Sequence, residues 1–216
     1  MRTIILFVAC VFFVTTFVNA QISKGSVFLG GDFSASRQKV KPDLGSSYST
    51  KWISVSPLAG KFIKDNLVLG ANLGFIYSNS GNDLDINTKI RGYQAGLFLR
   101  KYKNLGTSGF YIFGQVGLNG NHYTYNSKQG TGAYNDKLKQ VGISLVGYPG
   151  LSYAVNKKFH LETGFNQFIN LSFTHEKKEF INAPGNGYTH DTFAVSTSLN
   201  NATSALYLGF RVILGK

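Results

Sequence analysis

Residues 141–173 read VGISLVGYPGLSYAVNKKFHLETGFNQFINLSF, and apolar and polar side chains alternate on both sides of Asn156-Lys157-Lys158. Successive side chains of a β-strand point to opposite faces, so this period of two predicts two antiparallel strands joined by a short basic turn. One face is mainly apolar, and its apolar members are Val141, Ile143, Leu145, Leu151, Tyr153, Val155, Phe159, Leu161, Phe165, Ile169, Leu171 and Phe173.

The opposite face of this hairpin is small and polar. It carries glycine, serine and asparagine together with His160 and Glu162, and it also includes the aromatic Tyr148 and Phe168. A soluble barrel would fill its interior with apolar groups and keep a wet exterior. The observed mixture instead predicts the crowded polar lumen of a small barrel whose apolar face meets lipid.

Residues 1–20 are predicted to be a secretory signal peptide, leaving 21–216 as a single barrel domain. Met1-Arg2 is a cationic start, an apolar run follows to Phe17, and small residues precede Gln21. The run is short for a membrane anchor, and acylation at Cys10 would leave little hydrophobic region before the cysteine. Cys10 is the only cysteine of the chain, so the mature domain is expected to fold without disulfides.

Further alternating segments bring the predicted strands to eight, with approximate bounds 25–36, 51–63, 67–77, 90–102, 109–125, 141–155, 159–173 and 203–214. The connections after odd-numbered segments are long and those after even-numbered segments are tight. Outer-membrane barrels have this asymmetry, with long loops outside and short turns in the periplasm. A soluble lipocalin-like barrel also has eight strands, but that fold gives no reason for connections that alternate between long and short. The longest irregular stretch is expected at 175–201.

The formal net charge is +12, yet the basic residues occur singly or in pairs and never as a run on one periodic face. We therefore expect no nucleic-acid binding. A group of lysines falls instead at the predicted periplasmic turns, where the side chains would reach the phosphates of outer-membrane lipids. These are Lys61, Lys64, Lys101, Lys103, Lys157 and Lys158.

Four charged residues fall on the polar faces of the predicted strands: Asp32, Arg100, Glu162 and Arg211. Barrel closure would make the first and last strands neighbours, which would place Arg211 between Asp32 and Glu162. A buried charge is tolerated only when it is paired and hydrogen-bonded. We therefore predict a structural salt-bridge network that plugs the lumen, and an interior of eight strands is too narrow to favour a gated ion path.

The histidines raise the alternative of a lipid-modifying enzyme of the outer membrane, a deacylase or an acyltransferase. No Gly-x-Ser-x-Gly elbow accompanies them, so neither catalytic residues nor a cofactor are predicted. His175-Glu176 and His190-Asp191 share one connection, but loop histidines are more often solvated than bound to metal, and no metal site is predicted. The histidines are His122, His160, His175 and His190.

Four stretches resemble the recurring phrases of the outer-membrane β-barrel domain family of small Gram-negative proteins, of the OmpX and OmpA membrane-domain type. They are 56–70 (SPLAGKFIKDNLVLG), 96–102 (GLFLRKY), 149–153 (PGLSY) and 207–210 (YLGF). The resemblance covers nearly all of the mature chain and implies an all-β, eight-stranded antiparallel up-and-down transmembrane barrel. It departs at the C-terminus, because such chains often end on an aromatic residue read by the barrel-assembly machinery and this one ends Leu214-Gly215-Lys216.

These observations predict a monomeric, non-enzymatic protein of the cell outer membrane with no open pore and a structural or surface-interaction role carried by its outer loops. The expected partners are outer-membrane lipids, the barrel-assembly machinery during biogenesis, and a surface ligand at 175–201. Strand ends such as 122–125 are expected to offer an exposed sheet edge to such a ligand. A soluble lipocalin-like binder is the third alternative.

Overall fold

The computed structural model describes residues 22–41, 46–82, 87–128, 136–165, 168–181, 187–197 and 206–215, so the predicted signal peptide lies outside the described residues. In this part of the chain no helix has the length and apolar character needed to cross a membrane. The described chain is instead dominated by strands: β1 (Val27–Val40), β2 (Tyr48–Lys64), β3 (Leu67–Asn82), β4 (Asn87–Asn104), β5 (Phe110–Lys128), β6 (Asp136–Ala154), β7 (Phe159–Phe165), β8 (Ile169–Phe180), β9 (Tyr188–Ser196) and β10 (Leu206–Leu214).

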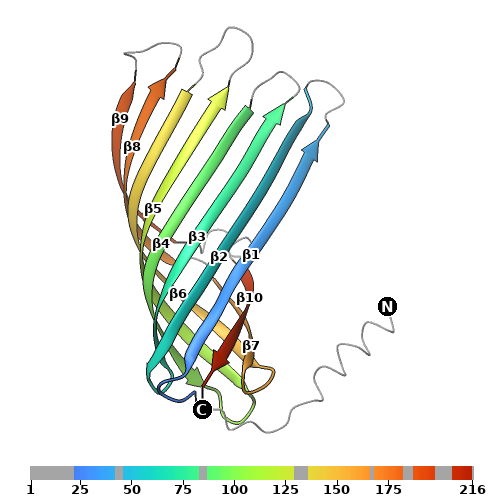
Figure 1. Ribbon diagram of the computed structural model, residues 1–216, viewed down its shortest axis with the longest axis vertical. Coiled ribbons are helices and arrows are strands. Elements are labelled where there is room, and N and C mark those ends of the chain that lie inside the picture. Colours follow the sequence, from blue (N-terminus) through green and yellow to red (C-terminus); the bar gives the residue numbers. More distant parts are fainter. Residues whose placement is uncertain are drawn as a thin grey trace.

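Eight strands close into an antiparallel barrel, which confirms the predicted fold (Figure 1). The strands from β1 to β6 pair in sequence order, and β6 pairs next with β7. β7 pairs with β10, and β10 returns to β1 over the register from Val27↔Leu214 to Gly31↔Phe210. The first and last strands are therefore neighbours, as the position of Arg211 in the predicted network required.

The seventh predicted segment is divided into β7 and β8, both of which pair with β6. Gly150 of β6 lies opposite Gly164, whereas Gly147 lies opposite Ile169, so two residues of β6 face four of the seventh segment. One of the two is Pro149, which has no N–H to donate to the neighbouring strand. The division follows from this local mismatch and separates a lower from an upper half of the sheet.

The prediction that 175–201 is irregular is wrong, because most of its described residues form strands. β8 continues to Phe180 and β9 runs back beside it, from Lys178↔Tyr188 to Asn170↔Ser196. The residues of this hairpin are rich in lysine, histidine, glutamate and threonine. Backbone pairing needs no apolar alternation, so a strand that rises beyond the apolar part of the barrel loses the period-two signal on which the prediction depended.

The exposed edge predicted at 122–125 is also wrong. His122 pairs with Tyr93 of β4 on one side and with Val141 of β6 on the other. β5 has neighbours along its whole length because both adjacent strands are about as long as it is. Among the described residues, β1 beyond Gly31 pairs only with β2, and β9 pairs only with β8.

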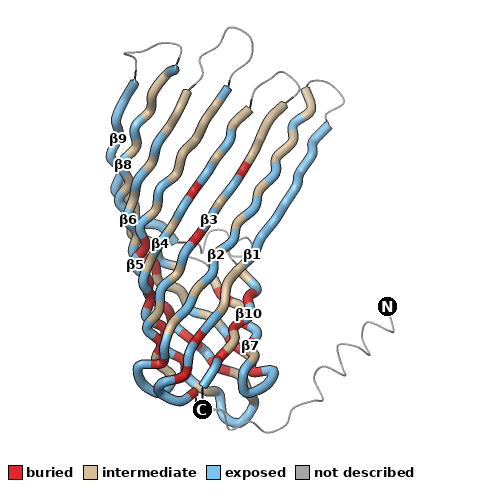
Figure 2. Tube along the Cα trace, in the orientation of Figure 1, coloured by how far each residue is buried: buried red, intermediate tan, exposed pale blue. Residues whose placement is uncertain are grey.

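Most of the buried residues lie at the end of the barrel that carries the C-terminus and the tight turns, here called the closed end (Figure 2). The lumen at this end is more aromatic than the sequence predicted. Its buried apolar core is made of Ile22, Phe28, Phe62, Val68, Phe98, Tyr102, Tyr111, Phe113, Ala154 and Ile213. These rings come from strands all around the barrel and pack against one another across the lumen.

One glycine and two turns shape the closed end. A Cβ at Gly70 would lie 2.4 Å from the ring of Phe98, so glycine leaves the space that the ring fills. Asn66 has a φ of 60° in the turn between β2 and β3, a conformation that asparagine tolerates better than most residues. In the turn at Asn156-Lys157-Lys158, the Asn156 side-chain oxygen accepts hydrogen bonds from the backbone N–H groups of Lys158 and Phe159.

Candidate functional site

The structure brings the four charged residues of the predicted network together at the closed end of the lumen. Asp32 lies on β1, Arg100 on β4, Glu162 on β7 and Arg211 on β10. Barrel closure is what joins them, since Arg100 and Glu162 are 62 positions apart and Asp32 and Arg211 are 179 apart.

The Glu162 carboxylate is shared by the two arginines. Arg100 Nη1 lies 2.7 Å from Glu162 Oε2, and Arg211 Nε lies 3.0 Å from the same oxygen. Arg211 Nη1 lies 3.3 Å from Asp32 Oδ1, so Arg211 stands between the two carboxylates. The three central side chains are buried, while the Asp32 side chain is 40% exposed. Two positive and two negative charges form a chain whose formal charge is zero.

Two further residues of the network were missed by the sequence analysis. The Tyr102 hydroxyl donates a hydrogen bond to Glu162 Oε1 at 2.6 Å and accepts one from Arg100 Nη1 at 3.0 Å. Gln115 accepts a hydrogen bond from Arg100 Nε at 2.7 Å. Both side chains lie on lumen faces. The period of two therefore placed them inside, but nothing in the sequence indicated at which height of the barrel they meet Arg100.

Aromatic rings pack around the parts of the Arg100 guanidinium that no carboxylate contacts. Its guanidinium carbon lies 4.4 Å from the ring centre of Phe113 and 5.0 Å from that of Phe28. Such contacts stabilise a cation electrostatically while they exclude water. These rings hold Arg100 in a site whose hydrogen-bond acceptors are Glu162, Tyr102 and Gln115.

Arg211 depends on glycines for its place. A Cβ at Gly30 would lie 2.3 Å from Arg211 Cδ, and one at Gly209 would lie 2.7 Å from Asp32 Oδ1. The guanidinium also donates to the backbone carbonyls of Gly31 and Phe210, at 3.1 and 2.9 Å. The glycines of β1 and β10 thus make room for the one arginine that crosses between these strands.

Above the charge network the lumen holds a cavity of about 820 Å³. Its polar lining is largely uncharged and comes from Ser34, Ser54, Ser56, Asn72, Gln94, Gln115, Asn119, Tyr148 and Tyr207, with Asp32 at one side. Asn72 donates a hydrogen bond to Asn119 at 3.2 Å. The hydroxyl of Tyr207 is buried and has no hydrogen-bond partner among the described residues. The cavity therefore offers neutral hydrogen-bonding groups, one of which is unused.

A serine–histidine pair lies at the closed end, where no motif predicted it. Ser152 Oγ and His160 Nδ1 are 3.2 Å apart, and both residues are at most 1% exposed. The imidazole packs against the ring of Tyr111, with the ring centres 5.6 Å apart. Neither residue lines the cavity. In this position the two side chains fill the closed end of the lumen and serve as hydrogen-bond partners for each other.

The histidines of the β8–β9 hairpin stand at the far end of the barrel. His175 and Asp191 are cross-strand partners whose Nδ1 and Oδ1 atoms lie 2.6 Å apart, while Glu176 is the partner of His190. Adjacent residues of a strand point to opposite faces, so the two pairs do not converge. Within the described ranges, no three histidine, cysteine, aspartate or glutamate side chains are grouped to hold a metal ion.

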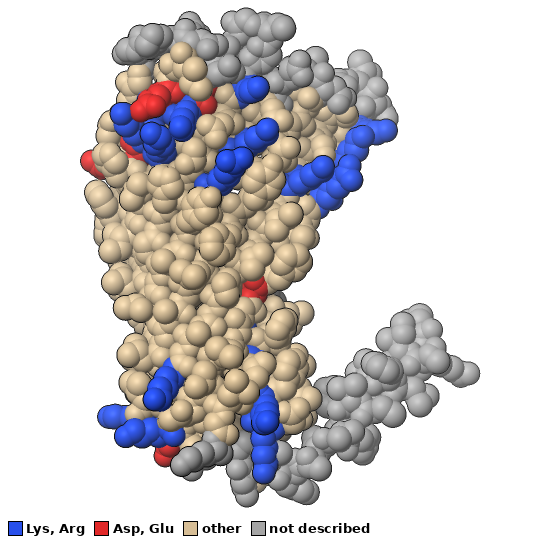
Figure 3. Space-filling model, in the orientation of Figure 1, with Lys and Arg blue, Asp and Glu red and all other residues tan. Residues whose placement is uncertain are grey.

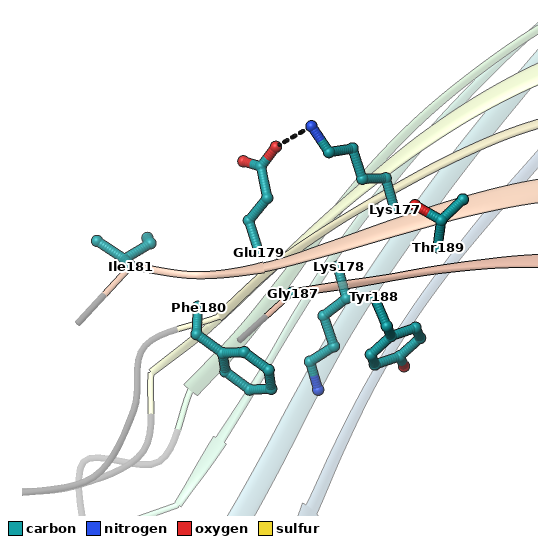
Figure 4. A pocket seen from close by; sticks show the side chains of 8 residues that line it. All are labelled: Lys177, Lys178, Glu179, Phe180, Ile181, Gly187, Tyr188 and Thr189. Carbon is teal, nitrogen blue, oxygen red and sulfur yellow. Dashed lines mark ion pairs between the residues drawn. The ribbon is translucent and has the colours of Figure 1, made fainter. Parts of the chain in front are cut away.

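A second hollow, of about 500 Å³, lies at the tip of the β8–β9 hairpin (Figure 4). Figure 4 shows Lys177 and Glu179 on one side of the hairpin, where they form an ion pair of 2.9 Å, with Lys178, Phe180 and Tyr188 on the other. Lys178 Nζ lies 2.6 Å from Asp136 Oδ2, and this hydrogen bond raises the pKa of the lysine. Both lysines of the hollow are thus paired with carboxylates, beside the rings of Phe180 and Tyr188.

No protein-family model and no curated protein matches the chain. Among solved structures, neisserial surface protein A is 18% identical, with a TM-score of 0.42 over 88% of this chain and 99% of that chain. A major outer membrane protein from Thermus thermophilus is 10% identical, with a TM-score of 0.48 over the same shares. At these identities the likeness concerns the fold alone.

We expect the variant Glu162→Gln to lower the free energy of unfolding by about 3 kcal/mol or more, because it leaves the buried Arg100 without a counter-charge and Arg211 with Asp32 alone. The measurement is urea-induced unfolding of the protein in lipid vesicles. Glu179→Gln is the matched control, since Glu179 lies at the exposed tip of the hairpin, and its midpoint should stay that of the wild type. A Glu162→Gln protein as stable as the wild type would contradict the structural role of the network.

Proposed function

We propose that the protein is an integral barrel of the outer membrane whose plugged lumen passes no solutes and whose outer strands act at the cell surface. The single observation that carries this proposal is the polarity of the barrel: charges are buried in its lumen while apolar side chains cover its outside. A soluble protein has the reverse arrangement, and only lipid makes this one favourable.

An apolar belt surrounds the barrel and supports membrane insertion. On β3 its outward members are Leu69, Leu73, Phe75 and Tyr77, each 40–50% exposed, and the neighbouring strands repeat the pattern. In Figure 3 the lysines and arginines gather toward the two ends of the molecule, and the zone between them is uncharged apart from a small acidic patch. An apolar band of about 25 Å is what an outer-membrane barrel presents to lipid.

The charge network supports the absence of a pore. Arg100, Glu162 and Arg211 cross the lumen at the closed end and are each at most 2% exposed. The aromatic core fills the space around them. An eight-stranded barrel has an interior only wide enough for side chains, so no continuous water path is expected past this section.

Outward-facing cations above the belt support outer-membrane lipids as partners. This basic collar consists of Arg37, Lys39, Lys51, Lys89, Arg91, Lys137, Lys139 and Lys177. Arg37 is paired directly with Lys51, and Lys139 with Lys177. Like charges placed opposite each other on a sheet repel, and anionic phosphates between them would relieve the repulsion. We propose that the collar binds phosphorylated headgroups of the outer leaflet.

The β8–β9 hairpin is the proposed site of a surface ligand. It extends beyond the belt and carries the hollow lined by Lys178, Phe180 and Tyr188, whose charged and aromatic groups suit a ligand with polar and apolar parts. During biogenesis we propose that the barrel-assembly machinery receives β10, the strand that closes the ring against β1 and ends in Leu214. The mature protein is proposed to act as a monomer.

Insertion and plugging are tested together. We expect the protein to remain in the washed outer-membrane fraction, to change its gel mobility on heating, and to give no steady ion current in a planar bilayer. Heat-denatured protein added to the same bilayer is the control for leakage caused by unfolded chains. A protein found in the soluble fraction would overturn the membrane proposal, and a steady current from the native protein would overturn the plug.

The collar is tested on a single strand. We expect Lys89→Gln combined with Arg91→Gln to lower the amount of phosphorylated outer-leaflet glycolipid that co-purifies after mild extraction, because each cation near the headgroups contributes about 1 kcal/mol. Lys101→Gln combined with Lys103→Gln, at the other end of β4, is the matched control and should leave this amount unchanged. Equal loss in both double variants would refute a specific role of the collar.

The orientation of the hairpin is tested by labelling intact cells with an amine reagent that does not cross membranes. Lys177 should react, whereas Lys157 in the turn at the closed end should react only after the cells are permeabilised. Mass spectrometry of the labelled peptides distinguishes the two lysines. If Lys157 is the one labelled on intact cells, the hairpin faces the periplasm and does not carry a surface ligand.

A further inference from the structure

Four neighbouring strands, β2 to β5, form a wall of the lumen above the charge network, and each pair keeps a constant register there. From Leu58 to the outer end of β2, and at the same heights on β3, β4 and β5, the inward side chains are all uncharged. The outward side chains of these strands include Lys51, Lys89 and Arg91 of the basic collar. The charges that attract anions thus lie outside the barrel, and the lumen wall behind them is neutral.

Glycines of β4 keep the space in front of this wall open. A Cβ at Gly92 would overlap the ring of Tyr123, and one at Gly96 would overlap Asn119 Oδ1. Because these glycines have no side chain, Tyr123 and Asn119 of β5 lie against the neighbouring strand instead of across the lumen. The space above the plug is the cavity of about 820 Å³, a volume within the range of sites that hold small organic ligands.

Aromatic rings stand at both ends of this cavity. Trp52, the only tryptophan of the chain, lines its outer part from a position between Lys51 and Ile53, which face outward. Ile53 belongs to the apolar belt and Lys51 to the collar, so Trp52 lies at the height where lipid gives way to water. At the inner end the rings of Tyr148 and Tyr207 pack edge to face, with their centres 6.1 Å apart.

Hydroxyl and amide groups line the cavity between these rings. Ser54 and Ser56 contribute from β2, and Gln94 contributes from β4. Asn72 and Asn119 contribute amides from β3 and β5, which are joined by a hydrogen bond of 3.2 Å. Each of these groups both donates and accepts, so the wall is suited to a ligand that carries several hydroxyl groups.

The charges near the cavity restrict the ligand further. The single charged residue of the lining, Asp32, is already paired with Arg211. A charged ligand would lose its water without gaining a counter-ion, which is costly. An uncharged ligand rich in hydroxyl groups would exchange hydrogen bonds with water for hydrogen bonds with the wall, and its C–H groups would pack on the face of Trp52.

We propose that the lumen cavity binds a neutral disaccharide, which enters from the outer end, packs on Trp52 and forms hydrogen bonds with Ser54, Gln94 and Asn119. The charge network below Tyr148 makes this a binding site and not a passage. The site rests on the proposed insertion in the outer membrane. It goes beyond the surface role of the outer strands, because the ligand lies inside the barrel.

Trp52 makes the site measurable, since its fluorescence responds to a ligand that packs on the ring. The mature protein is inserted in phosphatidylcholine vesicles and titrated with maltose, cellobiose and lactose, three neutral disaccharides. We expect at least one of them to change the emission of Trp52 in a saturable way and to protect it from acrylamide, a neutral quencher dissolved in water. Absence of a saturable response to all three would overturn the proposal.

Variants at neighbouring positions separate the cavity from the outer surface. Ser54→Phe fills the cavity and should abolish the saturable response, whereas Val55→Phe, on the lipid side of β2, should keep it. Gln94→Leu should weaken binding about fivefold, the effect of one lost hydrogen bond, while Tyr93→Phe on the outer face should not. Equal responses in Ser54→Phe and Val55→Phe would place the disaccharide outside the lumen and refute the site.

The class of ligand is tested with digalacturonate, a disaccharide that carries two carboxylates. It should bind at least about tenfold more weakly than the neutral disaccharide, because the cavity holds no free cation for it. Equal binding would overturn the uncharged class. Heat-dependent gel mobility is measured on the same vesicles. Inserted protein without a saturable response contradicts the lumen site alone, whereas protein that fails to insert contradicts the proposed function as well.

Discussion

The Glu162 carboxylate, shared between Arg100 and Arg211 at 2.7 and 3.0 Å, is the interaction on which the closed end of the barrel depends. It links β4, β7 and β10 across the lumen, and through Arg211 and Asp32 it reaches β1. Ions so deeply buried are tolerable only as a balanced and hydrogen-bonded set. Tyr102 and Gln115 supply hydrogen bonds to this set, and the glycines beside Arg211 leave space for its side chain. The surrounding residues thus accommodate the four charges.

This arrangement divides the barrel into two parts that differ in how the lumen is filled. At the closed end the ring of strands is complete, and aromatic side chains and ion pairs fill the lumen to exclude water. Above it the lumen widens into a cavity whose polar lining is largely uncharged.

Alternation was reliable where one face of a strand met the belt and the other met the lumen. It succeeded for the hairpin at 141–173, although Pro149 and the residues opposite it divide the second strand in two. It failed at 175–201 and at the edge expected at 122–125, because the upper strands continue beyond the belt by backbone pairing alone. In those strands histidine, lysine and threonine occupy both faces, and no periodic signal distinguishes a strand from a loop.

The sequence by itself determined the all-β class, the eight strands, the face of each strand that is apolar, and the inward direction of Asp32, Arg100, Glu162 and Arg211. These follow from a period of two, which is a local property of the chain. Only the tertiary structure decided how high each inward side chain lies, because height depends on the register between strands. That register brings Tyr102 and Gln115 to Arg100, places Ser152 beside His160, and carries β9 alongside β8 above the closed end.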